Sequence, residues 1–219
     1  GAYRYEPSEE MKALAQGEYK EDSFKVVISD STGNKIEADI SVTIDGTNDG
    51  PVINSNTITN AGGTSTGRLE FSDVDTSDTH TVTFDGLYAE GGKTPLSVDT
   101  ANMPEGSVFV YNAEGVLVGT LALQFTKGDG DKDVLSYTFT PDPGYANSLP
   151  VGSSNISFGV TVTDRNVAGT DMKSDTKPDQ TFTIENKNDV PESGEGTDVS
   201  RGDYEGTIVF SDKDILDTH

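Results

Sequence analysis

Carboxylate side chains recur at short, fixed spacings in this chain. One motif reads Ser72-Asp73-Val74-Asp75 and is followed after two residues by Asp78-Thr79-His80. Aspartates at this spacing offer several oxygens to one hard cation, and Ca²⁺ takes about six to eight oxygen ligands from carboxylates, carbonyls and water. The motif therefore predicts a metal site, and its oxygen chemistry favours Ca²⁺.

The acidic motif is part of a longer internal repeat. Residues 67–80 (GRLEFSDVDTSDTH) return as residues 206–219 (GTIVFSDKDILDTH), and residues 41–51 (SVTIDGTNDGP) return as residues 181–191 (TFTIENKNDVP). The two offsets are nearly equal, which indicates a tandem array with a period of roughly 140 residues. We expect residues 1–49 to be the back half of one unit, residues 50–189 a complete unit, and residues 190–219 the front part of the next.

Strand patterns dominate the elements that must position these carboxylates. Residues 24–28 and 158–162 place apolar side chains at every second position, and turn-forming residues separate the runs. Short strands without a long helix indicate an all-β fold, and a β-sandwich in particular. The one helical candidate, residues 8–16, opens with a Ser cap and predicts a single turn that crosses the end of a sandwich.

Counting strands alternately up and down tests whether the acidic loops meet. The loops 72–78, 127–133 and 164–169 then lie at one end of the sandwich, together with the linker 47–51. That end could hold one or two ions between adjacent units. The predicted ligands there are Asp49, Asp73, Asp75, Asp78, Asp129, Asp131, Asp133 and Asp164.

Further candidate ligands come from the linkers and from repeat-equivalent loops. They are Asn48, Asp30, Asp189, Asp212 and Asp214. We expect Asn48 to contribute through its backbone carbonyl. The alternative for an isolated loop aspartate is a turn cap. The run 129–133 begins like an EF-hand loop, but Val134 and Thr140 replace the required Gly and Glu, so an irregular Ca²⁺ loop and a solvated hairpin tip both stay open.

The composition disfavours several classes of partner and chemistry. There are 15 basic and 38 acidic residues, a net charge of −23, which disfavours binding to nucleic-acid phosphates and anionic lipid. The chain has no Cys, and no apolar run reaches the length of a membrane helix. His80 has no Cys or second His nearby, so we expect it to pack on its strand or bond a turn rather than bind zinc. We expect no enzymatic activity.

Taken together, the two repeated signatures resemble those of the VCBS repeat, a bacterial immunoglobulin-like, cadherin-like module of giant RTX adhesins. One signature is the acidic motif already described. The other is carried by Tyr3, Leu14, Gly17, Phe24, Asp30, Gly33, Ile44 and the run Gly46-Thr47-Asn48-Asp49. The second copy departs from this pattern, with Glu185-Asn186-Lys187 in place of Asp45-Gly46-Thr47.

The resemblance implies tandem immunoglobulin/cadherin-like sandwiches that form a Ca²⁺-rigidified extender of a secreted adhesin. Such a protein would leave the cell by type I secretion and support adhesion and biofilm formation at the bacterial surface. Its partners would be neighbouring repeats, with surface ligands bound through other domains. We also expect head-to-tail contact between chains, because residues 1–49 supply late strands and residues 190–219 supply early ones. The alternative is a carbohydrate- or peptide-binding module that uses Tyr88, Tyr111 and Tyr145.

Overall fold

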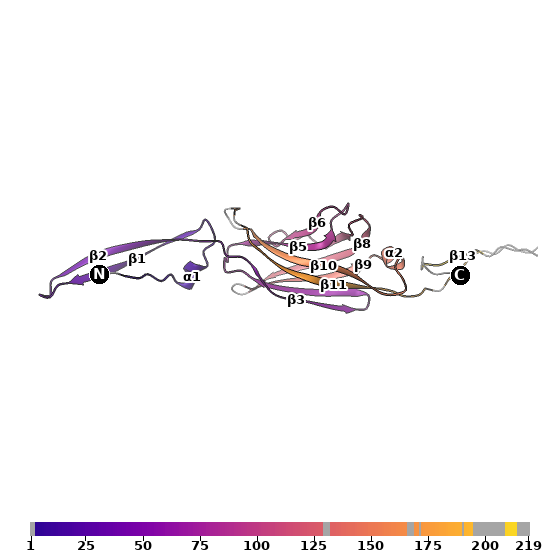
Figure 1. Cartoon of the computed structure of the whole chain (residues 1–219), viewed down its shortest axis with the longest axis horizontal. Coiled ribbons are helices and arrows are strands. Elements are labelled where there is room, and N and C mark those ends of the chain that lie inside the picture. Colours follow the sequence, from indigo (N-terminus) through magenta and orange to yellow (C-terminus); the bar gives the residue numbers. More distant parts are fainter. Residues whose placement is uncertain are drawn as a thin grey trace, which may run out of the picture.

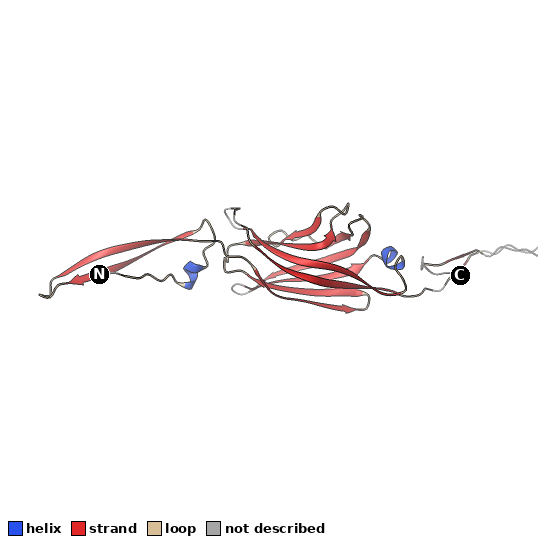
Figure 2. Cartoon of the chain, viewed as in Figure 1, coloured by secondary structure: helices blue, strands red, loops and turns tan. Residues whose placement is uncertain are grey.

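The computed structural model describes residues 3–128, 132–165, 169–170, 172–189, 191–194 and 209–213. The chain is drawn out along one axis, with an N-terminal hairpin on one side of a larger body of strands (Figure 1). Strands make up most of the structure, and the two helices are single short turns (Figure 2). None of the helices in these ranges has the length and apolar character needed to cross a membrane.

The N-terminal segment is a helical turn followed by a two-stranded hairpin. Helix α1 (Glu9–Lys12) begins at Ser8, whose side chain accepts a hydrogen bond from the backbone of Met11. Strand β1 (Tyr19–Ser29) pairs antiparallel with β2 (Lys35–Asp45) along its whole length. Phe24 on β1 contacts the rings of Tyr3 and Tyr5, so a small aromatic cluster attaches the leading chain to the hairpin.

The central body is one continuous sheet folded into two layers. The strand order is β11-β10-β5-β7-β8-β9-β4-β3, with β6 paired to β5. The sheet passes from one layer to the other between β5 and β7, which are paired only at Tyr88 and Tyr111. The elements are β3 (Val52–Ala61), β4 (Thr64–Ser72), β5 (Thr79–Tyr88), β6 (Pro95–Asp99), β7 (Ser107–Tyr111), β8 (Leu117–Lys127), β9 (Lys132–Pro141), α2 (Pro143–Asn147), β10 (Gly152–Arg165) and β11 (Ser174–Asn186).

Alternation along the strands builds the core between the layers. On β5, His80, Val82 and Phe84 are buried while their neighbours are more exposed. Buried aromatic and aliphatic residues of β4, β8, β9, β10 and β11 pack with Val82 and Phe84 in one hydrophobic cluster. Polar side chains also connect β3 and β11, the two strands at the ends of this order. The Asn56 amide of β3 donates to the Gln180 side-chain oxygen of β11 at 3.1 Å.

These observations confirm the all-β, sandwich-like prediction. Helix α1 is a single turn, as expected, but it lies beside the N-terminal hairpin rather than across the end of a sandwich. Helix α2 was not predicted, because an Asp cap with Pro-Gly after it reads as a turn. Two further short strands, β12 (Glu192–Ser193) and β13 (Phe210–Ser211), pair with each other beyond the sandwich.

The N-terminal hairpin and the pair β10–β11 have a similar arrangement of secondary structure. Each pair follows a short helix, and each is antiparallel. In the first pair Phe24 lies opposite Ile40, and in the second Phe158 lies opposite Gln180, the positions equivalent by sequence. The register then differs, because a bulge interrupts the second pair between Phe158 and Val160.

Candidate metal centre

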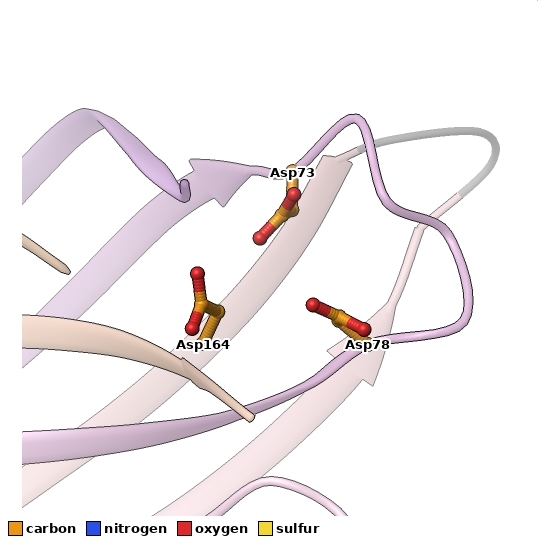
Figure 3. A group of neighbouring side chains, drawn as sticks. All are labelled: Asp73, Asp78 and Asp164. Carbon is orange, nitrogen blue, oxygen red and sulfur yellow. The ribbon is translucent and has the colours of Figure 1, made fainter. Parts of the chain in front are cut away.

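Three aspartates from different elements meet at the linker end of the sandwich. Asp73 follows β4, Asp78 precedes β5, and Asp164 lies near the end of β10. One carboxylate oxygen from each lies within 4.8 Å of those of the other two. Figure 3 shows the three carboxylates pointing toward a shared space. Antiparallel pairing produces this meeting, because it places Asp164 directly opposite His80 at the start of β5.

The carboxylates are buried, and some of their oxygens have no partner among the described residues. Asp78 is 2 % exposed, and neither of its side-chain oxygens accepts a hydrogen bond there. The same holds for Oδ1 of Asp75, which is 1 % exposed. A buried carboxylate without compensation is strongly unfavourable. A cation held by Asp73, Asp78 and Asp164, with Asp75 beside them, would supply the missing partner.

Burial also changes the acidity of this group. The pKa of Asp78 is raised to about 6, first by loss of hydration and then by the negative charges of Asp75, Asp73 and Asp164. The pKa of Asp75 is also raised to about 6 by burial, although the hydrogen bond from the backbone of Asp49 opposes the rise. All these donors are oxygens, which suits a hard divalent cation.

Further contacts orient the carboxylates of Asp73 and Asp133. Oδ1 of Asp73 accepts from the backbone N–H of Asp75 at 3.0 Å, which closes the loop after β4. Oδ2 of Asp73 lies 3.0 Å from Nε2 of His80. Asp133, also buried, accepts from the backbone N–H of Gly128 at 3.2 Å, and its other oxygen lies 3.9 Å from Nδ1 of His80.

The linker from the N-terminal hairpin binds directly to the same carboxylates. The amide of Asn48 donates to Oδ2 of Asp164 at 2.8 Å, and the backbone N–H of Asp49 donates to Oδ2 of Asp75 at 2.7 Å. The Asn48 side chain is buried, whereas that of Asp49 is exposed. The side chain of Asn48 thus faces the cluster, and its predicted role as a carbonyl ligand stays a prediction.

Lys173 connects the linker to Asp164 of the cluster. Its backbone N–H donates to Oδ1 of Asp164 at 2.9 Å, and its ammonium group bonds the carbonyl oxygen of Asn48. A Cβ at Gly50 would lie 2.9 Å from the Cβ of Lys173, so glycine is the residue that lets the two segments pass. Thr170 also donates to Gln16 at 3.2 Å across the joint.

The structure brings only part of the predicted ligand set together. Asp73, Asp75, Asp78, Asp133 and Asp164 converge with Asn48 and the backbone of Asp49, as the strand count predicted; whether they bind metal stays a prediction. Asp189 follows β11 and Asp212 follows β13, both away from this cluster. Asp129, Asp131 and Asp214 lie outside the described residues.

Asp30 is placed differently from the prediction. It follows β1, and its carboxylate accepts hydrogen bonds from the backbone and side chains of Thr32 and Asn34. These bonds, led by that from the Asn34 side chain, lower its pKa to about 2. Asp30 is exposed and caps its own turn, which is the alternative role considered for an isolated loop aspartate.

Two contributors to the site were not anticipated from the sequence. The role of Lys173 has no local signature, because it depends on the path of the linker. The alternating run Thr79–Phe84 did carry a signal for His80, since it puts His80 on the same inward face as Val82 and Phe84. The expectation of a packed or hydrogen-bonded His80 agrees with the structure, but its bond to a cluster aspartate was not foreseen.

Comparison of the chain with known protein families and with curated proteins gives no match. The three tyrosines considered for ligand binding lie in two places, and ligand binding through them stays a prediction. Tyr88 and Tyr111 are half-buried neighbours at the turn between layers, and Tyr145 packs against the hydrophobic core.

Proposed function

We propose that this chain is a non-enzymatic, Ca²⁺-stiffened part of an extended array of β-sandwiches. The observation that carries the proposal is Asp78, whose two buried oxygens have no hydrogen-bond partner in the described structure and face Asp73 and Asp164. Ca²⁺ is the preferred ion because all the donors are carboxylate oxygens, and Ca²⁺ accepts oxygen ligands in variable geometry.

The contacts of the linker explain how an ion would affect the joint. Asn48 and Asp49 each donate to a carboxylate of the cluster. Without a cation, the buried carboxylates repel one another and favour opening of the loops that carry them. A bound ion offsets this repulsion, holds Asp75 and Asp164 in place, and thereby holds the linker and the hairpin that precedes it.

Matching architecture supports an array rather than an isolated domain. The hairpin β1–β2 and the pair β10–β11 come from segments that align in the sequence. The strands of both pairs are in the same register at the aligned residues Phe24 and Phe158. The drawn-out shape and the resemblance to VCBS repeats fit an extender of a secreted, cell-surface adhesin that supports adhesion and biofilm formation. Ca²⁺ at extracellular concentrations would then stiffen the array after type I secretion.

Thermal melting with and without Ca²⁺ tests the proposal. Ligand binding to the folded state adds about 2.7 kcal/mol of stability at one hundred times Kd. We expect Ca²⁺ to raise the Tm of the wild type above its value in EDTA, and Asp78→Asn to remove this rise.

Asp30→Asn is the matched control. It changes an aspartate at a repeat-equivalent loop that lies outside the cluster, so the Ca²⁺-dependent rise in Tm should persist. A wild-type Tm that is the same in millimolar Ca²⁺ and in EDTA would contradict the proposal.

A further inference from the structure

We infer that His80 is a positioning residue for the cation site: its imidazole sets the orientation of Asp73, and so the affinity for the ion. The inference rests on the proposed cation binding. It differs from a packing role because a ring nitrogen, and not the shape of the ring, would be the part that matters.

The ring of His80 is held by its surroundings. It is 3 % exposed and lies edge-on to Phe71, with ring centroids 5.0 Å apart at an interplanar angle of 71°. Its backbone is fixed at both polar groups, since its N–H donates to Oγ1 of Thr100 at 3.0 Å and its carbonyl accepts from the N–H of Thr100 at 2.8 Å. The backbone of His80 is therefore anchored, and its buried ring packs against Phe71.

The two ring nitrogens of His80 lie near carboxylates of the cluster. Nε2 lies 3.0 Å from Oδ2 of Asp73, within hydrogen-bond distance, whereas Nδ1 lies 3.9 Å from Oδ2 of Asp133, beyond it. A ring with a proton on Nε2 fits this geometry, because Nε2 is the nitrogen that lies within hydrogen-bond distance of a carboxylate. The ring then donates to Asp73.

Asp73 is consequently held at both oxygens. Oδ1 accepts from the backbone of Asp75, and Oδ2 accepts from His80. Each carboxylate oxygen can accept more than one bond, so both keep capacity for a ligand. Fixing both oxygens gives Asp73 one orientation toward Asp78 and Asp164, and partners of this kind commonly contribute about 10–100-fold to metal affinity.

Two substitutions separate the hydrogen bond from the packing. His80→Phe keeps an aromatic ring against Phe71 but removes the donor to Asp73. His80→Gln removes the ring but can place an amide N–H near the position of Nε2. By calorimetric Ca²⁺ titration of the folded variants, we expect His80→Phe to weaken binding by about 10–100-fold, and His80→Gln to retain most of the wild-type affinity.

Wild-type affinity in His80→Phe would overturn the inference, because packing alone would then suffice. The tautomer of His80 gives a second readout that needs no ion and no substitution. In the metal-free protein, ¹H–¹⁵N spectra should show the proton on Nε2, and a proton on Nδ1 instead would overturn the inference. If the wild type bound no Ca²⁺, the proposed function would fail, while the tautomer would still test the contact with Asp73.

Discussion

At the scale of single residues, surroundings decide what an aspartate does. Asp30 and Asp164 are equivalent in the repeat that the sequence predicts, yet Asp30 is exposed and its oxygens are bonded within its own turn. Asp164 is fully buried and accepts from Asn48 and Lys173, which come from two other segments. Of these two residues, Asp164 is the one that faces further carboxylates in the described structure, so it is the one that could share a cation.

The raised pKa values of Asp75 and Asp78 predict how stability depends on pH in EDTA. Both carboxyls have a pKa of about 6 in the folded state, against an ordinary value of 3.8. Between these values the folded protein binds more protons than the unfolded chain, so these groups make stability fall as the pH rises from about 4 to about 6. We expect the Tm in EDTA to be higher at pH 5 than at pH 7.

Ca²⁺ should act in the opposite sense, because it needs the deprotonated carboxylates. The rise in Tm caused by Ca²⁺ should therefore be larger at pH 7 than at pH 5. Asp30, with a pKa of about 2, titrates below this window and should not contribute. The double variant Asp75→Asn, Asp78→Asn should lose most of the difference in EDTA, and an unchanged difference would show that other groups cause it.

At the scale of elements, the sandwich depends on close contact between neighbouring strands. On β4, Gly67 lies against Tyr137 of β9, and a Cβ at Gly67 would lie only 2.0 Å from the tyrosine ring. The hydroxyl of Tyr137 donates to the Asn56 side chain of β3 at 2.8 Å. One missing side chain thus allows a buried tyrosine to connect three strands of the same layer.

Gly67→Ala should accordingly disturb the core. We expect it to lower the free energy of unfolding by about 1–3 kcal/mol, because the added methyl group must displace Tyr137. Urea unfolding measures the effect. Gly159→Ala is the matched control: Gly159 is also a strand residue, and its nearest atom to an added Cβ is 3.6 Å away. Equal losses in the two variants would argue against the contact with Tyr137 as the cause.

At the scale of the whole molecule, two kinds of interaction connect the hairpin to the sandwich. One is the cluster of carboxylates, which depends on a cation in our proposal. The other is Lys173, whose ammonium group bonds the carbonyl of Asn48 without any ion. The joint should therefore keep part of its order in EDTA and gain the rest when Ca²⁺ binds.

Spin-label distances can test the contribution of Lys173. The chain has no Cys, so cysteines introduced at the exposed positions Lys35 and Ser107 would be labelled uniquely. In EDTA, Lys173→Met should broaden the distance distribution between hairpin and sandwich, and Ca²⁺ should narrow it again. The control is Lys177→Met, which changes an exposed lysine of β11, the strand that Lys173 precedes, and it should leave the width unchanged. An equally narrow distribution in Lys173→Met would exclude this role for Lys173.

The sequence by itself determined the strands, the two-layer fold class and the end of the sandwich where the aspartates meet. Alternation of apolar residues encodes which face of a strand is buried, and antiparallel order places every second loop at the same end. Only the tertiary structure decided which aspartates are ligand candidates. The bonds from Asn48 to Asp164 and from Lys173 to Asn48 join segments far apart in the chain, whereas the contact of His80 with Asp73 spans the loop between β4 and β5. The burial of Asp78 and Asp164 and the exposure of Asp30 depend on how the strands pack around them rather than on local sequence.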